Sequence, residues 1–383
     1  MTLLNEEKRP LDDKSDYEEP SQHPHDEDWN YAALSLPISR SITQDPNQAY
    51  KLTSSWRNVA LVTDGSNVPG LGDAGPLAAM PLIERKGKLL TKLAQITPIP
   101  LILANKSPEE AVSALSALRL SFGAVNLVGM NEATAMEVKR RLTENVDTPV
   151  FLDNQDGLPI LCLAALLNAA VVVNKKVSEL KLVILGDENE ALPIVDFLHL
   201  TGLIEILVVD RSGIIHVGRP GPTNWIKEEL AQKTNPSQVK GPLSKALNQA
   251  DVLIALSNIL SVTKDLIAQM AAEPIVFDLA DLNLERLEKK GVFAAVKGPG
   301  PNLLSSALVF PGLLRGVLEA KARVLNAPMK MAAALALAKL VPEAELAADF
   351  ILPKVDKANL VASMAEAVSV AATASGAGRM VIF

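Results

Sequence analysis

Short apolar runs alternate with longer segments of helical periodicity along most of this 383-residue chain. In the first half, the apolar runs predict strands and the intervening segments, with apolar residues every three to four positions, predict helices. The predicted strands are residues 58–62, 98–103, 124–128 and 148–152, and the predicted helices are residues 78–94, 108–118 and 132–143. Strands separated by helices indicate a parallel sheet. We expect ordered structure to begin near Asp45.

A second alternating series follows a long apolar segment, residues 158–173, which predicts a buried helix. Its predicted strands are residues 180–185, 205–209, 251–255, 274–277 and 292–296, followed by helices at 313–325 and 329–340. This order is typical of a doubly wound, Rossmann-like sheet with a helical C-terminal extension. The fold class is therefore α/β with two domains. The predicted divisions are an acidic, disordered tail at 1–30, a first domain at 31–155 and a second at 156–383.

Composition narrows the possible partners. Hydrophobic residues make up 48% of the chain and the net charge is −7, which argues against nucleic acid as a partner. The one cysteine, Cys162, falls inside the apolar run at 158–173 and is interpreted as a core residue of a protein in a reducing compartment. Because Pro159 and Asn168 interrupt that run, and no signal peptide is visible, we expect a cytoplasmic protein without a membrane span. His23 and His25 lie in the acidic tail, where a solvated role is favoured over metal binding.

The loop after the first strand of the second series is the place for a dinucleotide pyrophosphate. Only Gly186 matches a G-x-G-x-x-G pattern, since Glu188 and Ala191 occupy its second and third glycine positions. With Asp187 and Glu190, three carboxylates crowd this loop. Two like charges about 4 Å apart repel by about 4 kcal/mol at an effective dielectric of about 20. We therefore expect weak pyrophosphate binding.

Asp210 ends the next predicted strand, at the place where a dinucleotide site positions an acid for the ribose. Strand-end aspartates are common for purely structural reasons. Gly186 and Asp210 are thus the candidate cofactor-binding residues, as remnants of a site.

Residues 62–90, VTDGSNVPGLGDAGPLAAMPLIERKGKLL, resemble the malate-binding region of bacterial malic enzymes. Further similar blocks follow in the same order, at residues 124–127, 148–153, 233–236, 310–316 and 329–338. The resemblance implies oxidative decarboxylation of malate with NAD(P) and a divalent cation, Mg²⁺ or Mn²⁺. Such chemistry needs a hydride acceptor, a metal, a general base and an acid.

The resemblance also implies catalytic residues. The family's lysine base corresponds to Lys86, with Lys88 as the less favoured register, and its tyrosine acid corresponds to Tyr31. The sequence alone leaves open whether Lys86 is a functional residue or a solvent-exposed residue of its helix.

The implied metal site is changed. The family's paired acids correspond to Val128 and Gly129, and its third ligand, the second acid of a D-D pair, corresponds to Asn154 beside Asp153. Hard divalent cations favour carboxylates, so Asp153 and Asn154 are remnants of a metal site. The family's substrate asparagines correspond to Ser305 and Ser306, and its A-N-P stretch to residues 280–282.

Two functions follow. The favoured hypothesis is a catalytically impaired malic-enzyme homologue that binds a small dicarboxylate or 2-hydroxy acid, or that pairs with an active malic enzyme and modulates it. The alternative is an active, divergent NAD(P)-dependent malate oxidoreductase that forms pyruvate. In either case we expect a homodimer, since proteins of this plan are usually symmetric oligomers with N-terminal segments at the interface.

Overall fold

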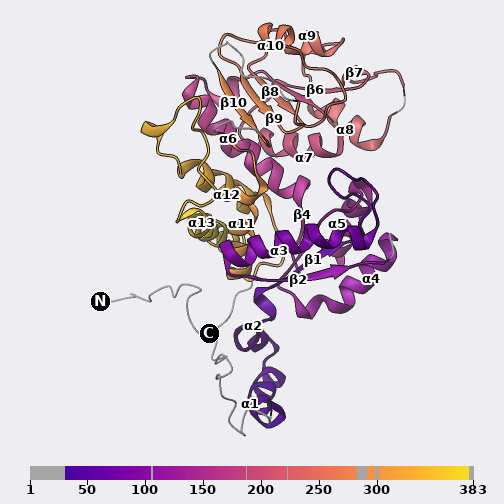
Figure 1. Ribbon diagram of the computed structural model, residues 1–383, viewed down its shortest axis with the longest axis vertical. Helices are drawn as coiled ribbons and strands as arrows, with labels where there is room; N and C mark the ends of the chain where they lie inside the picture. The colour runs from indigo at the N-terminus through magenta and orange to yellow at the C-terminus, as the bar shows by residue number, and fades with distance from the viewer. Residues whose placement is uncertain are drawn as a thin grey trace.

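Two sheets, stacked along the long axis of the molecule and joined by a long central helix, organise the computed structural model (Figure 1). The structure describes residues 31–104, 107–186, 188–221, 223–282, 291–297 and 302–378. The strands are β1 (Asn58–Thr63), β2 (Thr97–Ile102), β3 (Ala124–Leu127), β4 (Val150–Leu152), β5 (Leu182–Leu185), β6 (Ile206–Asp210), β7 (Gly213–Ile214), β8 (Val252–Ala255), β9 (Ile275–Asp278) and β10 (Val292–Ala295). The helices are α1 (Tyr31–Gln44), α2 (Ala49–Leu52), α3 (Met80–Ala94), α4 (Pro108–Leu118), α5 (Glu132–Asn145), α6 (Leu158–Val172), α7 (Glu188–His199), α8 (Trp225–Lys233), α9 (Leu243–Leu247), α10 (Lys264–Ala268), α11 (Phe310–Glu319), α12 (Ala327–Lys339) and α13 (Leu360–Ala374). This arrangement confirms the predicted two-part α/β fold.

The first sheet has the strand order β2-β1-β3-β4, with every pair parallel. Side chains that alternate along β1 enter different cores. Leu61 packs with Ile83 and Leu90 of α3, whereas Val62 packs with residues of α4 and α5 on the other face. Helices therefore cover both faces, as a parallel sheet requires.

The second sheet has the order β10-β9-β8-β5-β6-β7. Its first five strands are parallel, which confirms the doubly wound prediction. The antiparallel β7 was not predicted, because two residues in a tight hairpin with β6 carry no periodic signal.

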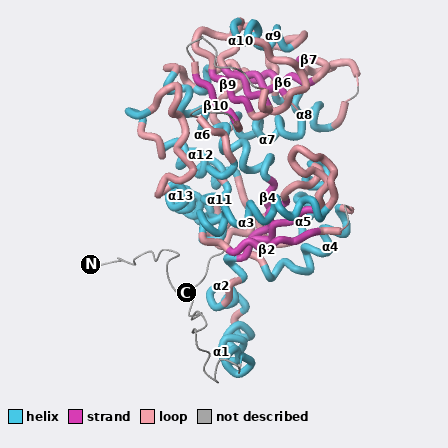
Figure 2. The backbone as a smooth tube through the Cα atoms, viewed as in Figure 1, coloured by secondary structure: helices cyan, strands magenta, loops and turns pink. Residues whose placement is uncertain are grey.

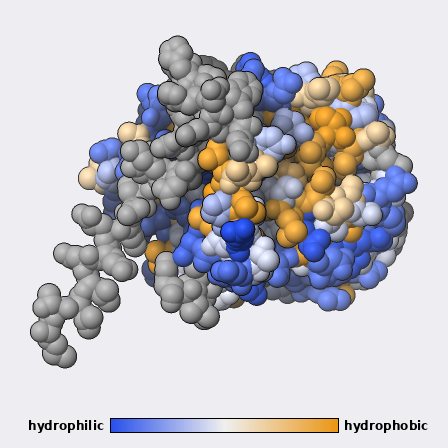
Figure 3. All heavy atoms as spheres, turned by 90° about the horizontal axis from the view of Figure 1, so that it is seen from below, coloured by the Kyte–Doolittle hydropathy of each residue, from blue (hydrophilic) through white to orange (hydrophobic). Residues whose placement is uncertain are grey.

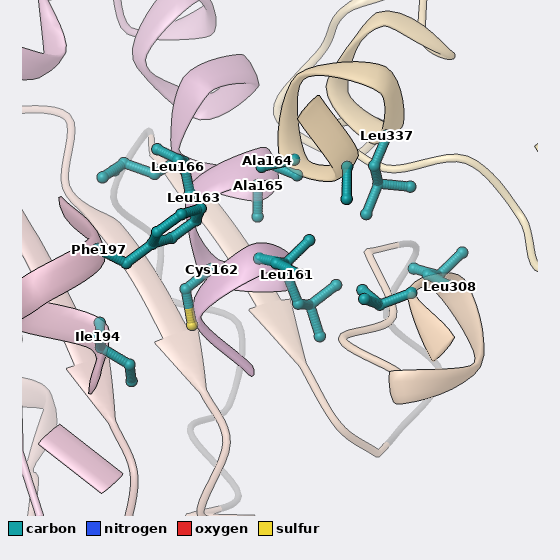
Figure 4. Packing of buried hydrophobic residues seen from close by; sticks show 14 of the residues in the cluster. Leu161, Cys162, Leu163, Ala164, Ala165, Leu166, Ile194, Phe197, Leu308 and Leu337 are labelled. Carbon is teal, nitrogen blue, oxygen red and sulfur yellow. The ribbon is translucent and has the colours of Figure 1, made fainter. Parts of the chain in front are cut away.

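The central helix α6 is buried on nearly all sides, with Ile160 to Leu166 each at most 3% exposed. Its packing against Ile194 and Phe197 of α7, Leu308 and Leu337 is seen in Figure 4. Together with the preceding turn it is a 20-residue segment apolar enough to cross a membrane by length and composition, yet 72% of its most apolar 18-residue stretch is buried inside the protein. This burial agrees with a core helix.

The C-terminal helices return to the first sheet. α11 packs on α3 and on α13, and α12 packs on α6 and α13. The predicted bounds 313–325 were wrong, because α11 begins at Phe310, with Pro311 in its first turn, and ends at Glu319, just before Lys321 adopts a φ of 48°. The assignment of this extension to the second domain stays a prediction.

The expectation that order begins near Asp45 was wrong. Residues 31–44 form α1, which extends away from the sheets (Figure 2) and has no buried residue. Tyr31 and Leu34 are 79% and 57% exposed on it. Seen from this end, apolar patches lie among polar regions of the surface (Figure 3). The predicted tail at 1–30, with His23 and His25, lies outside the described residues.

Candidate functional site

A lysine–aspartate pair forms the centre of the candidate site, at the carboxyl edge of the first sheet. Lys86 Nζ lies 2.6 Å from each carboxylate oxygen of Asp153. The inward-facing residues Ile83, Gly87 and Leu90 of α3 direct this side of the helix toward the sheet. Asp153 follows β4 directly, so the strand and the helix together bring the two charges into contact.

Asn126 completes the cluster, and the sequence reasoning did not single it out. Its Nδ2 donates to Asp153 Oδ1 at 3.0 Å and to the carbonyl of Phe151 at 3.3 Å. Asn126 is fully buried on β3, and its Oδ1 has no partner among the described residues. A polar residue within the apolar run at 124–128 was the available signal.

Lys86 is also held by an aromatic ring. Its Nζ lies 4.5 Å from the ring centroid of Phe310, which in turn meets Phe151 edge to face. The side chain of Lys86 is only 12% exposed. Lys86 is therefore not a solvated helix residue, whereas Lys88 is exposed and lies outside the cluster.

The glycine turn of residues 65–75 has a clear structural role. The Gly65 carbonyl accepts hydrogen bonds from the backbone N–H groups of Ala74 and Gly75, at 3.2 and 3.1 Å. Gly65 has a φ of 70°, and a Cβ there would lie 2.0 Å from the Gly75 oxygen. Only glycine fits at this position.

The three positions matched to metal ligands offer no carboxylate. Val128 is buried at 7% exposure, and Gly129 adopts a φ of 64° with its carbonyl bound to the Asn67 N–H at 3.0 Å. Asn154 Nδ2 donates to Glu190 Oε1 at 2.7 Å. No group of three or more His, Cys, Asp or Glu side chains able to hold a metal exists among the described residues. This donor set does not fit a hard divalent cation.

Asp156 is a buried charge that the sequence analysis missed, although an acid before an apolar helix was visible. Its carboxylate is 1% exposed and lies 2.6 Å from Lys139 Nζ and 2.6 Å from Lys330 Nζ. It also accepts the Leu152 N–H at 2.9 Å. Burial alone would raise the pKa of Asp156, but the two lysines outweigh it and lower the pKa to about 2.

The loop after β5 differs from a phosphate-binding loop in its side-chain contacts as well as in its sequence. A Cβ at Gly186 would lie 2.6 Å from Leu256 Cβ, so glycine is needed here for packing. Glu188 accepts a hydrogen bond from Asn224 Nδ2 at 2.9 Å and lies 3.8 Å from Lys227 Nζ. Asp187 lies outside the described residues, and Ala191 is buried.

Asp210 lies at the end of β6, as predicted, with its carboxylate already bound. Arg219 donates to both of its oxygens at 2.8 and 2.6 Å, and the Ser212 N–H donates at 2.8 Å. Burial opposes ionisation of Asp210, but these donors lower its pKa overall. Lys227 Nζ lies 3.4 Å from the same carboxylate.

The remaining predicted residues do not join the cluster in this chain. Tyr31 is exposed on α1, and this helix lies away from the sheets (Figure 1). Ser305 caps a short 3-10 helix by accepting the Ala307 N–H at 3.2 Å, and Ser306 is exposed. In the segment 280–282, Asp281 forms an ion pair with Lys297 at 2.8 Å.

A parallel first sheet with a lysine–aspartate cluster at its edge, joined to a doubly wound second sheet, defines a two-domain α/β protein with a Rossmann-like second domain. The family profile "Malic enzyme, N-terminal domain" matches residues 39–113, and "Malic enzyme, NAD binding domain" matches residues 301–375. The chain belongs to the malic enzyme family. The resemblance drawn from the sequence is thus confirmed.

Individual relatives agree. The chain is 38% identical to an NAD-dependent malic enzyme of Geobacillus stearothermophilus, over 89% of this chain and 72% of that protein. It is 35% identical to a bifunctional malic/malolactic enzyme of Bacillus subtilis, over 90% and 85%. The crystal structure of an NAD-dependent malic enzyme from Thermotoga maritima superposes with a TM-score of 0.84 at 30% identity, covering 92% of this chain and 95% of that one.

Proposed function

We propose that this protein is a malic-enzyme homologue without metal-dependent malate oxidation, acting as a small-acid-binding or regulatory protein. The supporting observation is the set of side chains at the implied ligand positions. Val128 is apolar and buried, Gly129 has no side chain, and the amide of Asn154 is bound to Glu190. Without these carboxylates, no divalent cation is held where it would polarise a keto-acid carbonyl.

The nucleotide site supports the same proposal. The family is associated with NAD or NADP, yet Glu188 and Glu190 stand in the first turn of α7, where a pyrophosphate would approach. An anion there meets two carboxylates, which oppose the favourable field of the helix N-terminus. NAD(P) binding is therefore weak in this proposal, and Mg²⁺ or Mn²⁺ does not enhance it.

A small dicarboxylate or 2-hydroxy acid is the proposed ligand class. The turn at 65–75 retains the glycines of the malate-binding region. Lys86, which follows this turn in the sequence, has an ammonium group held in place by Asp153. A carboxylate approaching Lys86 is attracted by that group, although Asp153 already neutralises much of its charge.

Fluorescence titration with NADH, with and without Mn²⁺, tests the cofactor half of the proposal. We expect no saturable binding at millimolar nucleotide in either condition.

Thermal denaturation with malate then tests ligand binding, and we expect a rise in Tm that does not depend on Mn²⁺. Tight NADH binding that requires Mn²⁺ would overturn the proposal in favour of an active malate oxidoreductase, the alternative that the relatives' activities favour.

A homodimer in the cytosol, or a complex with an active malic enzyme, completes the proposal. Helix α1 supports it, since a 14-residue helix without buried residues is marginal on its own and exposes Tyr31 and Leu34. Light scattering at micromolar concentration is expected to give a dimer. A monomer alone would contradict this part.

A further inference from the structure

Three successive side chains at the junction of β4 and α6 bind elements on both sides of that junction. They belong to a single π-helical turn, Asp153–Gly157, in which the N–H of Leu158 donates to the carbonyl of Asp153. Such turns are rare and occur often at functional positions. The first of the three, Asn154, binds Glu190 of α7, beside the second sheet.

Gln155 is the second. Its Nε2 donates to the carbonyl of Asn189, on α7, at 2.9 Å. The same nitrogen lies 3.3 Å from Glu132 Oε1, in the first turn of α5. One amide group thus connects a helix of the first sheet to a helix of the second.

Asp156 is the third. It binds Lys139 of α5 and Lys330 of α12, each at 2.6 Å. Lys330 Nζ also lies 3.4 Å from the Gln155 carbonyl. Because the carboxylate is buried, neither lysine is easily replaced by water.

We propose that Asn154, Gln155 and Asp156 form a junction clamp that holds the two sheets in one arrangement without metal or nucleotide. The proposal rests partly on the proposed function, since Asn154 occupies a position that the resemblance assigns to a metal ligand, and Glu190 lies in the loop where a doubly wound fold places the pyrophosphate. In enzymes that close on their substrates, ligands supply the free energy that favours the closed arrangement. Here, the side chains at the two ligand positions bind each other directly.

The consequence is an arrangement of the two sheets that does not respond to malate, NAD or Mn²⁺. A fixed surface suits a regulatory protein that presents the same face to its partner at all times. Residues 154–156 and the first turn of α7 are then expected to be protected from exchange in the ligand-free protein.

Hydrogen–deuterium exchange on the full chain tests the clamp. In the double variant Gln155→Ala/Glu190→Ala we expect exchange in residues 150–158 and 188–195 to rise about tenfold or more, because the three hydrogen bonds made by the Gln155 amide and by Glu190 with Asn154 are lost. Glu188→Ala is the matched control, since Asn224 and Lys227 both lie on the side of the second sheet. Glu190→Gln keeps an acceptor oxygen and is expected to remain like the wild type.

An equal rise in the Glu188→Ala control, or no rise in the double variant, would overturn the clamp. Small-angle X-ray scattering adds a second readout: the wild-type curve is expected to stay unchanged on addition of malate, NAD and Mn²⁺, and contraction would overturn the proposal. Malate turnover is measured separately. Malate turnover together with the expected exchange results would contradict the proposed function alone. Exchange results that differ from those expected, without turnover, would contradict the clamp alone.

Discussion

Asp156, at the end of the first sheet, and Lys330, near the start of α12, form an ion pair of 2.6 Å between segments far apart in the sequence. The carboxylate is 1% exposed and shares Lys139 as a second partner. The two lysines give this buried group a net positive environment. The C-terminal helices are therefore tied by charge, as well as by apolar packing, to the junction between the sheets.

Replacing the carboxylate of Asp156 tests how much these ion pairs stabilise the fold. Asp156→Asn leaves Lys139 and Lys330 without their shared partner, and we expect a loss of about 3–5 kcal/mol in the free energy of unfolding at pH 7. Urea denaturation measures it. Glu144→Gln is the matched control, because its pair with Arg140 is exposed and such pairs contribute about 0–1 kcal/mol.

The same pair predicts a pH dependence. The pKa of Asp156 is about 2 in the folded protein, below the 3.8 of an unperturbed aspartate, so its charge stabilises the fold above about pH 5. This contribution, about 2 kcal/mol from the shift, is lost as the pH falls toward 2. The difference in unfolding free energy between wild type and Asp156→Asn should shrink over that window. A difference that stays constant from pH 7 to pH 3 would contradict the assignment.

A double-mutant cycle tests the coupling of Lys86 to Asp153. Lys86→Met keeps an unbranched side chain but removes the ammonium group and its contact with the Phe310 ring, and Asp153→Asn removes the charge of the carboxylate. We expect each single change to cost about 1–2 kcal/mol, and the double change to cost less than their sum by about 1 kcal/mol. Chemical denaturation gives all three values. Strict additivity would show that the two charges do not depend on each other.

The backbone at Gly129 is predicted to need glycine. Its φ is 64°, and a Cβ would lie 3.1 Å from Leu82 Cδ2 and 3.2 Å from Thr63 Oγ1. Gly129→Ala should cost about 1–2 kcal/mol of stability. Gly70→Ala is the control, because its φ of 79° is similar but a Cβ there meets nothing within 4 Å. A smaller loss at Gly129 than at Gly70 would contradict the packing argument.

Cys162 is predicted to be unreactive in the folded protein. It is fully buried on α6, and burial, with a smaller effect of the Glu190 charge, raises the pKa of its thiol to about 12. Thiolate is the reactive form, so labelling by a maleimide or an aromatic disulfide should occur only after unfolding. Labelling of the native protein within minutes would show that α6 is accessible.

The sequence was sufficient for the parallel strands of both sheets, because each is a short apolar run whose burial on two faces leaves a continuous signal. It also indicated Lys86 and Asp153, through the resemblance. It missed Asn126 and Asp156, since a single polar residue in an apolar run does not show which distant side chain will meet it. It missed α1 as well, whose helical pattern lacks a buried face to mark it.

The central claim concerns metal-dependent chemistry, and malate turnover by the purified protein tests it most directly. With malate, NAD or NADP and Mn²⁺, the formation of reduced nicotinamide is measured by absorbance, for the wild type and for Lys86→Ala. The carboxylate-free ligand positions at Val128, Gly129 and Asn154 predict no formation above the rate without protein. Reduced nicotinamide that appears only with Mn²⁺ and disappears in Lys86→Ala would contradict the account.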